Sequence, residues 1–316
     1  MGLTQILDAV DRFQRRRPWL SIPFAVVKRY GESDVGNLAA TLAYYGFFSL
    51  FPLLLVLSSV GGFLLQDQPD LQQRVLNSAF AQFPVIGDQI RGNVGTIQGS
   101  GVAVIVGLAL AVWAGIGGIR GAQHALDTVW DVPRKRRPGT PKSIGLALLM
   151  LLVLAAFIVT AAFITFLVGL AGPAGVVLGL VASVIVNIAF FALGYRVLTT
   201  ADVSWREVAP GAIVGGIGWT ALIALGGWFM SNRISSSTHI YGTFAVVIGL
   251  LGWIYVGAQL ALLGAVANVV VSNRLWPRSL RGELTSADRL ALRRSAGQEE
   301  RRSDEDVDVS FEERQR

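Results

Sequence analysis

Six long apolar segments, separated by shorter polar stretches, dominate the hydropathy pattern of this 316-residue chain. Each is about 20 residues or longer, which is the length that an α-helix needs to cross a bilayer. Backbone amides cannot stay unpaired in hydrocarbon, so such segments cross as helices. The pattern predicts an all-α, polytopic integral membrane protein, a bundle of six transmembrane helices. The predicted spans are residues 38–65, 101–123, 143–170, 174–198, 207–230 and 241–271.

The stretches outside the spans are polar and complete the predicted domain organisation. Residues 1–30 are amphipathic and rich in arginine, as is typical of a cytoplasmic segment lying in the membrane interface. Residues 31–275 form the transmembrane domain. Residues 276–316 form a charged cytoplasmic tail, predicted to be largely disordered from Ala296 onward. Thr285 and Asp288 have the spacing of a helix start, so a short helix is expected first.

Positive charge is distributed unequally between the two sets of loops. Six Lys and Arg residues precede the first span, five lie between the second and third, and ten follow the sixth. Loops rich in Lys and Arg stay in the cytoplasm, so both ends of the chain are predicted to be cytoplasmic. The basic residues before the first span are expected to meet anionic lipid headgroups. These residues are Arg15, Arg16, Arg17, Lys28 and Arg29.

Composition supports a membrane protein and excludes several kinds of site. The chain is 53% hydrophobic and 15% charged, with a mean hydropathy of +0.54, whereas soluble domains average about 25% charged residues. The net charge of +6 lies between and beyond the apolar segments, so no nucleic-acid partner is predicted. With no cysteine and two histidines, the chain is expected to hold no metal site, and no cofactor is predicted.

The first predicted span carries a polar stripe. Asn37, Thr41, Tyr45 and Ser49 recur every four residues, which places them along one helical face beside Tyr44. Pro52 lacks the amide hydrogen that would continue the helical ladder, so a kink is expected there. The stripe is either a packing face or the wall of a pathway. Both alternatives remain open from the sequence.

A charged cluster follows the second span. Arg120, His124, Asp127 and Asp131 have spacings of four, three and four residues, which puts them on one helical face at the cytoplasmic end. One interpretation is an interfacial helix end whose Arg120 reaches outward to water. The other is a cytoplasmic gate or headgroup site in which Arg120 holds a phosphate or carboxylate.

Small residues and neutral polar residues in the spans indicate helix packing. The glycine pairs Gly117/Gly121 and Gly211/Gly215 fit close helix contacts. Tyr255 shares a face of the sixth span with Gln259, which could form a hydrogen bond across helices. No Asp or Glu lies in the central part of a span, which argues against transport coupled to protons or sodium through a buried carboxylate.

Three motifs together resemble the YihY/BrkB family of bacterial membrane proteins, over about residues 20–275. They are Thr41-Leu-Ala-Tyr-Tyr-Gly-Phe-Phe-Ser-Leu-Phe-Pro52, then residues 113–120 with Ala125-Leu-Asp-Thr-Val-Trp130, and finally residues 241–244, 252–255 and 263–265. The resemblance implies a six-helix protein of the bacterial inner membrane. Labels in this family include ribonuclease BN, virulence factor and, for one branch, lipid exporter. A glutamate that commonly follows the last motif is Val266 here.

The first hypothesis is therefore an exporter or flippase of an amphipathic molecule such as a lipid. The alternative is a membrane scaffold or envelope-integrity factor that transports nothing. A membrane enzyme is third, because no nucleophile–base pair or metal cluster is apparent and two histidines cannot supply a nuclease site. The candidate pathway residues are Asn37, Thr41, Tyr44, Tyr45, Ser49, Pro52, Arg120, His124, Asp127, Tyr255 and Gln259.

Overall fold

The computed structural model describes residues 11, 13, 14, 17–64, 101–170, 172–233, 238–280 and 283–311. Side chains within these ranges are described except at positions 18, 50–64, 101–104, 162, 165, 166, 169, 170, 172–174, 227–233 and 238–246. This part of the chain forms eight α-helices and one short 3-10 helix, and it contains no β-strand. In chain order the elements are α2 (Pro18–Glu32), α3 (Val35–Leu64), α6 (Gly101–Val129), η1 (Arg134–Arg136), α7 (Thr140–Leu170), α8 (Gly172–Leu198), α9 (Trp205–Arg233), α10 (Thr238–Ser272) and α11 (Ser286–Gly297).

Five helices contain a stretch that is long and apolar enough to cross a membrane. They match the second to sixth predicted spans. α3 covers the first predicted span as a helix, but its side chains beyond residue 49 lie outside the described residues. The count of six spans therefore stays a prediction. The five stretches are Ile105–Val129, Thr140–Ala161, Gly175–Leu198, Trp205–Gly226 and Val247–Ser272.

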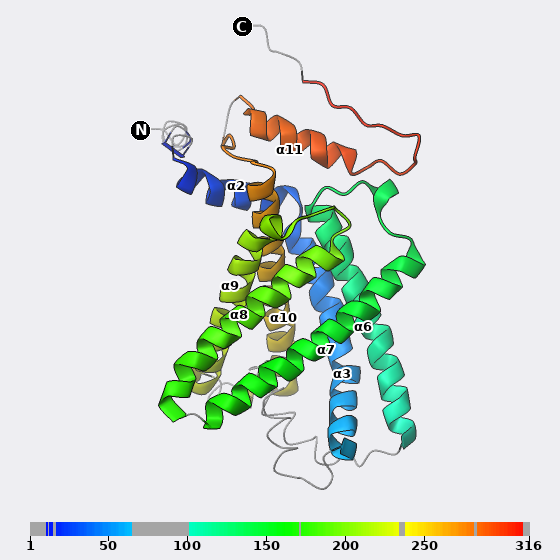
Figure 1. The fold of residues 1–316 in the computed structure, drawn as a ribbon, viewed down its shortest axis with the longest axis vertical. Coiled ribbons are helices and arrows are strands. Elements are labelled where there is room, and N and C mark those ends of the chain that lie inside the picture. The colour runs from blue at the N-terminus through cyan, green and yellow to red at the C-terminus, as the bar shows by residue number, and fades with distance from the viewer. Residues whose placement is uncertain are drawn as a thin grey trace.

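The long helices form one bundle, with α2 and α11 lying across one end of it (Figure 1). α3 packs against α6 and α10, while α9 packs against α8 and α10. α7 completes the bundle by packing on α8 and α6. α2 contacts the C-terminal part of the bundle through α10. The bundle thus brings α3 next to α6, and this pair forms the site described below.

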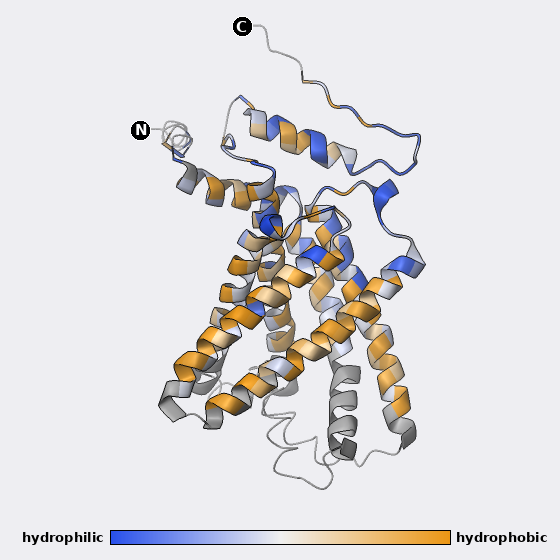
Figure 2. Ribbon diagram, in the orientation of Figure 1, coloured by the Kyte–Doolittle hydropathy of each residue, from blue (hydrophilic) through white to orange (hydrophobic). Residues whose placement is uncertain are grey.

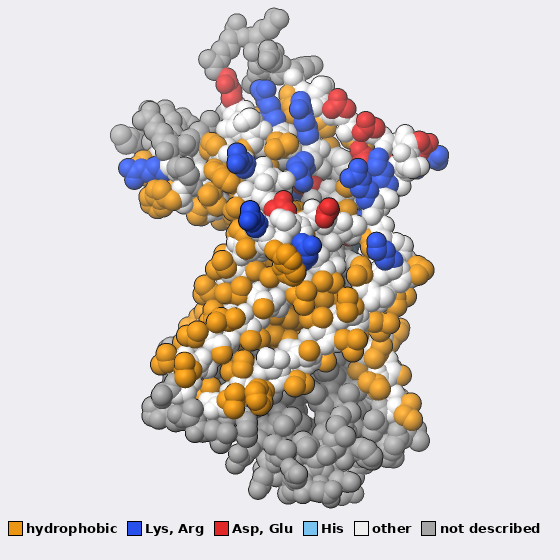
Figure 3. Space-filling model, viewed as in Figure 1, with side chains coloured by type: hydrophobic (Ala, Val, Ile, Leu, Met, Phe, Trp, Pro, Cys, Tyr) orange, Lys and Arg blue, Asp and Glu red, His pale blue; other side chains and the backbone are white. Residues whose placement is uncertain are grey.

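The outer surface of the bundle is apolar and its α2/α11 end is charged. Orange positions run along α7 and α8 in Figure 2, and the Lys, Arg, Asp and Glu side chains of Figure 3 gather at the end formed by α2, α11 and the α6–α7 loop. Leu152 and Leu178 are 69% and 70% exposed. A contiguous apolar surface of this kind is unfavourable in water. It fits contact with lipid chains.

Glycine residues let α9 and α10 approach closely. The amide of Gly211 donates a hydrogen bond of 2.6 Å to Oδ1 of Asn268, which is fully buried. A Cβ at Gly264 would lie 2.7 Å from the carbonyl oxygen of Gly211 and would overlap the hydroxyl of Tyr195. The Tyr195 hydroxyl donates to the carbonyl of Ala261 at 2.6 Å. The predicted glycine contact at Gly211 is confirmed, and its partner is Gly264.

This close approach predicts different outcomes for two substitutions on α10. Gly264→Ala should lower the free energy of unfolding by roughly 1–3 kcal/mol, because the backbone of α9 must move away. Gly252→Ala is the matched control, since a Cβ there meets no atom within 4 Å. It should be neutral or stabilise by up to about 1 kcal/mol, because alanine favours helix. Thermal unfolding of the purified protein in detergent measures both, and equal stability of the two variants would contradict the packing.

α11 is fastened to α2 through the carboxylate of Asp288. Asp288 and Thr285 form a reciprocal capping box, as their spacing predicts. The same carboxylate accepts hydrogen bonds from Lys28 Nζ at 2.8 Å and Arg278 Nε at 2.7 Å. Arg278 also donates to Glu32 at 2.6 Å. One acidic residue of α11 therefore binds a cation of α2, 260 residues away in the chain, and a second cation from the stretch just before α11.

Arg29 connects α2 to the end of α6. Its side chain is 1% exposed and forms an ion pair with Asp131. Its guanidinium also donates to the carbonyl of Val129 at 3.2 Å and to the hydroxyl of Ser295 at 3.0 Å. Buried charges need such partners, because removal from water is costly. Arg29 thus joins α2, α6 and α11.

The structure differs here from two expectations. Arg29 is too buried to meet lipid headgroups, and Lys28 binds Asp288, because acidic partners far along the chain take both side chains. Arg15 and Arg16 lie outside the described residues, while Arg17 is exposed, with its guanidinium 4.7 Å from the ring centre of Phe13.

The tail is ordered over part of the length predicted to be disordered. The amide of Lys135 donates to the carbonyl of Glu300 at 2.9 Å, and its ammonium forms an ion pair with the Glu300 carboxylate at 2.8 Å. Gln298 donates to Asp131 at 2.7 Å. Residues 298–305 are held because Glu299 and Glu300 pair with Arg134 and Lys135 of the basic α6–α7 loop, and Lys135 also donates to the carbonyl of Glu305. Residues 312–316 lie outside the described part of the chain.

The contacts of Asp288 predict how the docking of α11 responds to acid. Burial alone raises the pKa of this carboxyl, but hydrogen bonds from Lys28, Arg278 and Thr285 outweigh burial and hold the pKa well below its ordinary value of 3.8. A carboxyl with a lowered pKa stabilises the folded state above its ordinary pKa, and the stabilisation is lost progressively as the pH falls from that value through the lowered pKa of the folded protein. Docking should be constant from about pH 7 to 5 and weaken below about pH 4.

Spin labels can measure this response, because the chain has no cysteine of its own. Cysteines at Val27 on α2 and Leu290 on α11, both exposed, would carry the labels. The distance between them should be narrowly distributed at neutral pH and should broaden progressively as the pH falls below about 4. Asp288→Asn should broaden it at neutral pH, whereas Asp304→Asn, an exposed aspartate outside this cluster, should not. A distribution that does not broaden at any pH below about 4 would contradict the prediction.

Candidate functional site

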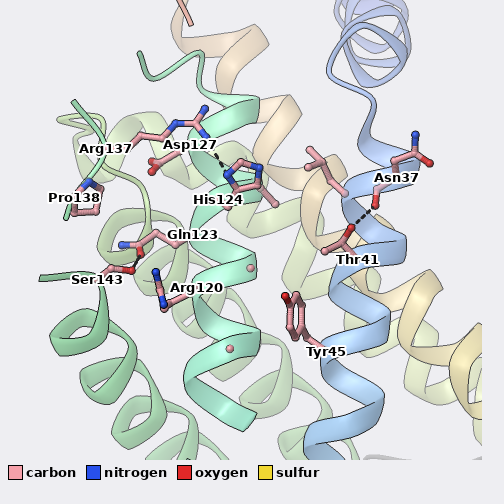
Figure 4. Close-up of a pocket in the computed structure, with 14 residues that line it drawn as sticks. Asn37, Thr41, Tyr45, Arg120, Gln123, His124, Asp127, Arg137, Pro138 and Ser143 are labelled. Atoms are coloured by element: carbon pink, nitrogen blue, oxygen red, sulfur yellow. Dashed lines mark hydrogen bonds between the residues drawn. The ribbon is translucent and has the colours of Figure 1, made fainter. Parts of the chain in front are cut away.

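A pocket of about 630 Å³ lies between α3 and α6 at the charged end of the bundle, beside the α6–α7 loop and the start of α7 (Figure 4). Six of the eleven predicted pathway residues line it: Asn37, Thr41, Tyr45, Arg120, His124 and Asp127. The polar stripe of the first span and the charged cluster after the second span therefore face each other. Several other lining residues were not predicted from the sequence, among them Gln123, Arg137, Pro138 and Ser143.

The α3 wall is polar because its stripe turns toward the pocket. Asn37 donates to the carboxylate of Asp34 at 2.7 Å. The hydroxyl of Thr41 donates to the backbone carbonyl of Asn37 at 3.0 Å. Both side chains are exposed at the pocket surface. Their local bonds hold them in place without taking them out of reach of a ligand.

Tyr45 lies across glycines of α6. A Cβ added at Gly121 or Gly117 would come within 3.2 Å and 3.6 Å of its ring. The absence of side chains at these two positions therefore makes room for the aromatic ring between the helices. The predicted glycine contact at Gly117 and Gly121 is confirmed. The ring remains 39% exposed, and its hydroxyl points toward the pocket (Figure 4).

Arg137 of the α6–α7 loop is fixed by three groups. Its Nε donates to the carbonyl of Val132 at 3.2 Å, and Nη2 lies 3.4 Å from the hydroxyl of Thr128. Its Nη1 lies 3.0 Å from Nδ1 of His124. A guanidinium has only donors, so Nδ1 of His124 accepts and the neutral imidazole carries its proton on Nε2. Burial lowers the pKa of Arg137, which still stays charged at neutral pH.

Asp127 is tied to the loop between α8 and α9. Its Oδ1 accepts from the amide of Thr200 at 2.7 Å, and its Oδ2 accepts from the Thr200 hydroxyl at 2.9 Å. The residue is almost fully buried. A carboxylate held in this way is part of the pocket wall. A second wall contact joins α6 to α7, where the Ser143 hydroxyl donates to Oε1 of Gln123 at 2.6 Å.

The remaining predicted residues with described side chains do not line the pocket. Tyr44 is exposed beside Phe48, with ring centres 4.8 Å apart, and Ser49 donates to the carbonyl of Gly46 at 2.9 Å. α3 continues as a helix through Pro52, whose side chain lies outside the described residues, so the expected kink stays a prediction. Tyr255 and Gln259 are half-buried on α10.

A smaller apolar cavity of about 230 Å³ lies on the other face of α6. Its α6 residues are Ile119, Ala122 and Leu126, which point away from the face that carries Arg120 and His124. α7, α8, α3 and α10 complete its lining. The two cavities are therefore on opposite sides of the same helix.

Comparison with known proteins identifies the family. Residues 26–287 match the family described as Virulence factor BrkB. The chain belongs to this family. Its relatives include membrane proteins, and five of its helices can cross a bilayer, so the BrkB-family chain is a membrane-embedded protein. The family resemblance noted in the sequence is confirmed.

Several relatives show how far the similarity extends. YfkH of Bacillus subtilis (strain 168), named as ribonuclease-like, is 24% identical over 78% of this chain and 93% of its own length. The UPF0761 membrane protein Nmul_A0452 of Nitrosospira multiformis (strain ATCC 25196 / NCIMB 11849 / C 71) is 26% identical over 78% of this chain. A UPF0761 membrane protein of Albidiferax ferrireducens (strain ATCC BAA-621 / DSM 15236 / T118) is 27% identical over 83% of this chain.

The chain spans only 60% and 65% of the length of the two UPF0761 relatives. No solved structure matches it significantly. Within the BrkB-family chain, the motif from Thr41 to Pro52 supplies part of the α3 wall, and the motifs near Arg120 and Asp127 supply the α6 wall. Val266, which replaces the common glutamate, is 0% exposed in the core and does not line the pocket.

The contacts of Asp127 predict a loss of stability when it is truncated. Asp127→Ala should lower the free energy of unfolding by about 1–3 kcal/mol, because the amide and hydroxyl of Thr200 lose their acceptor. Asp202→Ala is the matched control, since Asp202 is exposed in the same loop. Thermal unfolding in detergent compares the two variants. A change of less than about 0.5 kcal/mol for Asp127→Ala would contradict the assigned bonds.

Proposed function

We propose that this chain is a bacterial inner-membrane protein that moves an amphipathic molecule, such as a lipid, between the two leaflets. Both chain ends are cytoplasmic in this proposal, and six helices span the membrane. The observation that carries it is the pocket between α3 and α6. It combines polar and charged groups from two long apolar helices at the boundary between the apolar belt and the charged end.

The distribution of charge supports the cytoplasmic orientation of both ends. Basic residues gather at the end of the bundle that carries α2, α11 and the α6–α7 loop (Figure 3). That loop contributes Arg134, Lys135, Arg136 and Arg137. Such clusters favour the cytoplasmic side. E. coli YhjD is named an inner membrane protein and is 26% identical over 41% of this chain, which supports the same membrane here.

α2 supports a position in the membrane interface. Trp19 is 65% exposed and Val27 is 67% exposed, and Pro23 between them is also exposed. The three residues follow a spacing of four, so they form one apolar stripe on the helix. Tryptophan beside arginine is typical of segments at the headgroup level. Arg17 is the described basic residue best placed to meet anionic lipid, since its side chain is exposed.

The placement of the pocket supports a headgroup as the part that enters it. The polar pocket and the apolar cavity lie on opposite faces of α6, so one molecule cannot fill both without passing that helix. The apolar part of the cargo would remain in the surrounding bilayer. A polar groove beside lipid lowers the cost of carrying a headgroup through hydrocarbon.

Exchange of lipid between leaflets tests the proposal. Vesicles containing the purified protein should exchange fluorescent phospholipid faster than protein-free vesicles. Tyr45→Phe should slow the exchange by about two- to tenfold, the effect of one lost hydrogen bond. Tyr44→Phe is the control, because the neighbouring ring lies outside the pocket. Equal exchange with and without protein, across several lipids, would overturn the proposal.

A membrane scaffold is the second candidate function. The observation in its favour is the exposed end of the ordered tail, where Arg301, Arg302 and Asp304 have mostly exposed side chains. A partner could bind there without disturbing the bundle. Removal of residues 301–316 keeps α11 and Gln298. If the protein is a scaffold, this truncation should abolish its activity in the cell and leave leaflet exchange unchanged. Normal activity of the truncated chain in the cell would exclude a role for that surface.

A further inference from the structure

The pocket contains more positive than negative charge that is open to a ligand. Arg120 and Arg137 are the two cationic side chains in its lining. Asp127 is the carboxylate in that lining, and both of its oxygens already accept hydrogen bonds from Thr200. His124 accepts a hydrogen bond from Arg137 and is neutral in that arrangement. Asp127 is close enough to attract Arg137, but among the described residues no lining carboxylate forms an ion pair with either arginine.

Arg120 is the more available of the two cations. Among the described residues, none forms an ion pair or a hydrogen bond with its guanidinium, and the side chain is exposed at the pocket. It belongs to the apolar stretch Ile105–Val129, where a charge is costly without a partner. A guanidinium can bind two oxygens of one anion in parallel.

Arg137 is held ready by its neighbours. Three of its five N–H groups point to Val132, Thr128 and His124. Two N–H groups remain for a ligand. Because its position is already fixed, it loses little side-chain freedom when it binds an anion.

Gln123 adds a neutral donor to the same wall. The side chain is 4% exposed, and its Oε1 accepts from Ser143. Its Nε2 is buried and has no hydrogen-bond partner in the described part of the chain. A buried donor without a partner is unfavourable, so an acceptor atom from a ligand would stabilise it.

We infer that the pocket binds a phosphate ester or another phosphate-type anion, with Arg120 and Arg137 as its cationic partners and Gln123 as a neutral donor. The inference rests on the proposed function, because it names the chemical class that the same pocket accepts. A phosphate group has enough oxygens for two guanidinium groups and one amide at once. The shared chemistry fits a lipid headgroup and a free phosphate, and the test separates these sources.

Titration of the full-length protein in a neutral detergent tests the inference. The probes are short-chain phosphatidylglycerol, short-chain phosphatidylcholine and inorganic phosphate. Phosphatidylglycerol should bind most tightly, because the choline cation of the second lipid offsets its phosphate. Tighter binding of inorganic phosphate than of either lipid would support the site and assign a free anion as its ligand. Absence of binding by all three probes would overturn the inference.

Substitutions identify the binding residues. Arg120→Gln should weaken binding by roughly ten- to a hundredfold, and Arg137→Gln should weaken it as well. Arg120→Lys keeps the charge and should restore part of the affinity. Arg136→Gln is the control, since Arg136 is exposed on the same loop but does not line the pocket. Equal weakening by Arg136→Gln would show general surface attraction and overturn the inference.

Two further measurements keep the outcomes distinct. The thermal unfolding of unliganded Arg120→Gln should match that of the wild type, because no described residue forms a hydrogen bond or an ion pair with Arg120 and its side chain is exposed. Binding without leaflet exchange would overturn the proposed transport and leave the anion site standing. Leaflet exchange without binding of any probe would overturn the anion site and leave the proposed transport standing.

Discussion

A buried ion pair between Arg29 and Asp131 joins the three parts of the chain that form the charged end of the molecule. Asp131 also accepts from Gln298 at 2.7 Å and from Ser295 at 3.3 Å, so α2, α6 and α11 meet at one carboxylate. Its backbone has a positive φ of 56°, which ends α6 and turns the chain toward the basic loop. Losing one partner of a buried pair costs about 3–5 kcal/mol. The position of the loop that carries Arg137 depends on this pair.

The last turn of α6 and the residues just after it hold the pocket wall in place. Asp127 and Asp131 are four residues apart, and they bind different parts of the molecule. Asp127 holds the α8–α9 loop through Thr200, whereas Asp131 holds α2 and α11. These contacts leave His124 and Arg120, on the same helix, free to face α3. The polar wall is therefore stabilised by contacts that a ligand does not touch.

Much of the fold could be predicted from the sequence, because the length of an apolar run directly reflects the helix that it forms. Periodicity also placed Asn37, Thr41 and Tyr45 on one face, and all three line the pocket. Tyr255 and Gln259 also share a helical face, but periodicity does not say which neighbour a face meets. Arg137 was missed because it lies on a loop, where no period applies.

The tail shows a related limit of the sequence. Its composition is typical of disorder, and composition describes a segment on its own. Glu300 is ordered by Lys135, and Asp288 by Lys28, which lies 260 residues away in the chain. The number of charged residues in a sequence does not show which acidic side chain pairs with which basic side chain. The same limit explains why Lys28 and Arg29 were expected at the lipid surface.

The contacts between α2 and α11 determine the order in which parts of the protein can assemble during translation. Arg29 leaves the ribosome 266 residues before its partner Ser295. At about 5–20 residues per second, this delay lasts roughly 13–53 s. During this time the bundle helices enter the membrane and Arg29 can already pair with Asp131, whereas Asp288, which binds Lys28, has not yet been made. The contacts between α2 and α11 can form only after nearly the whole chain has been translated.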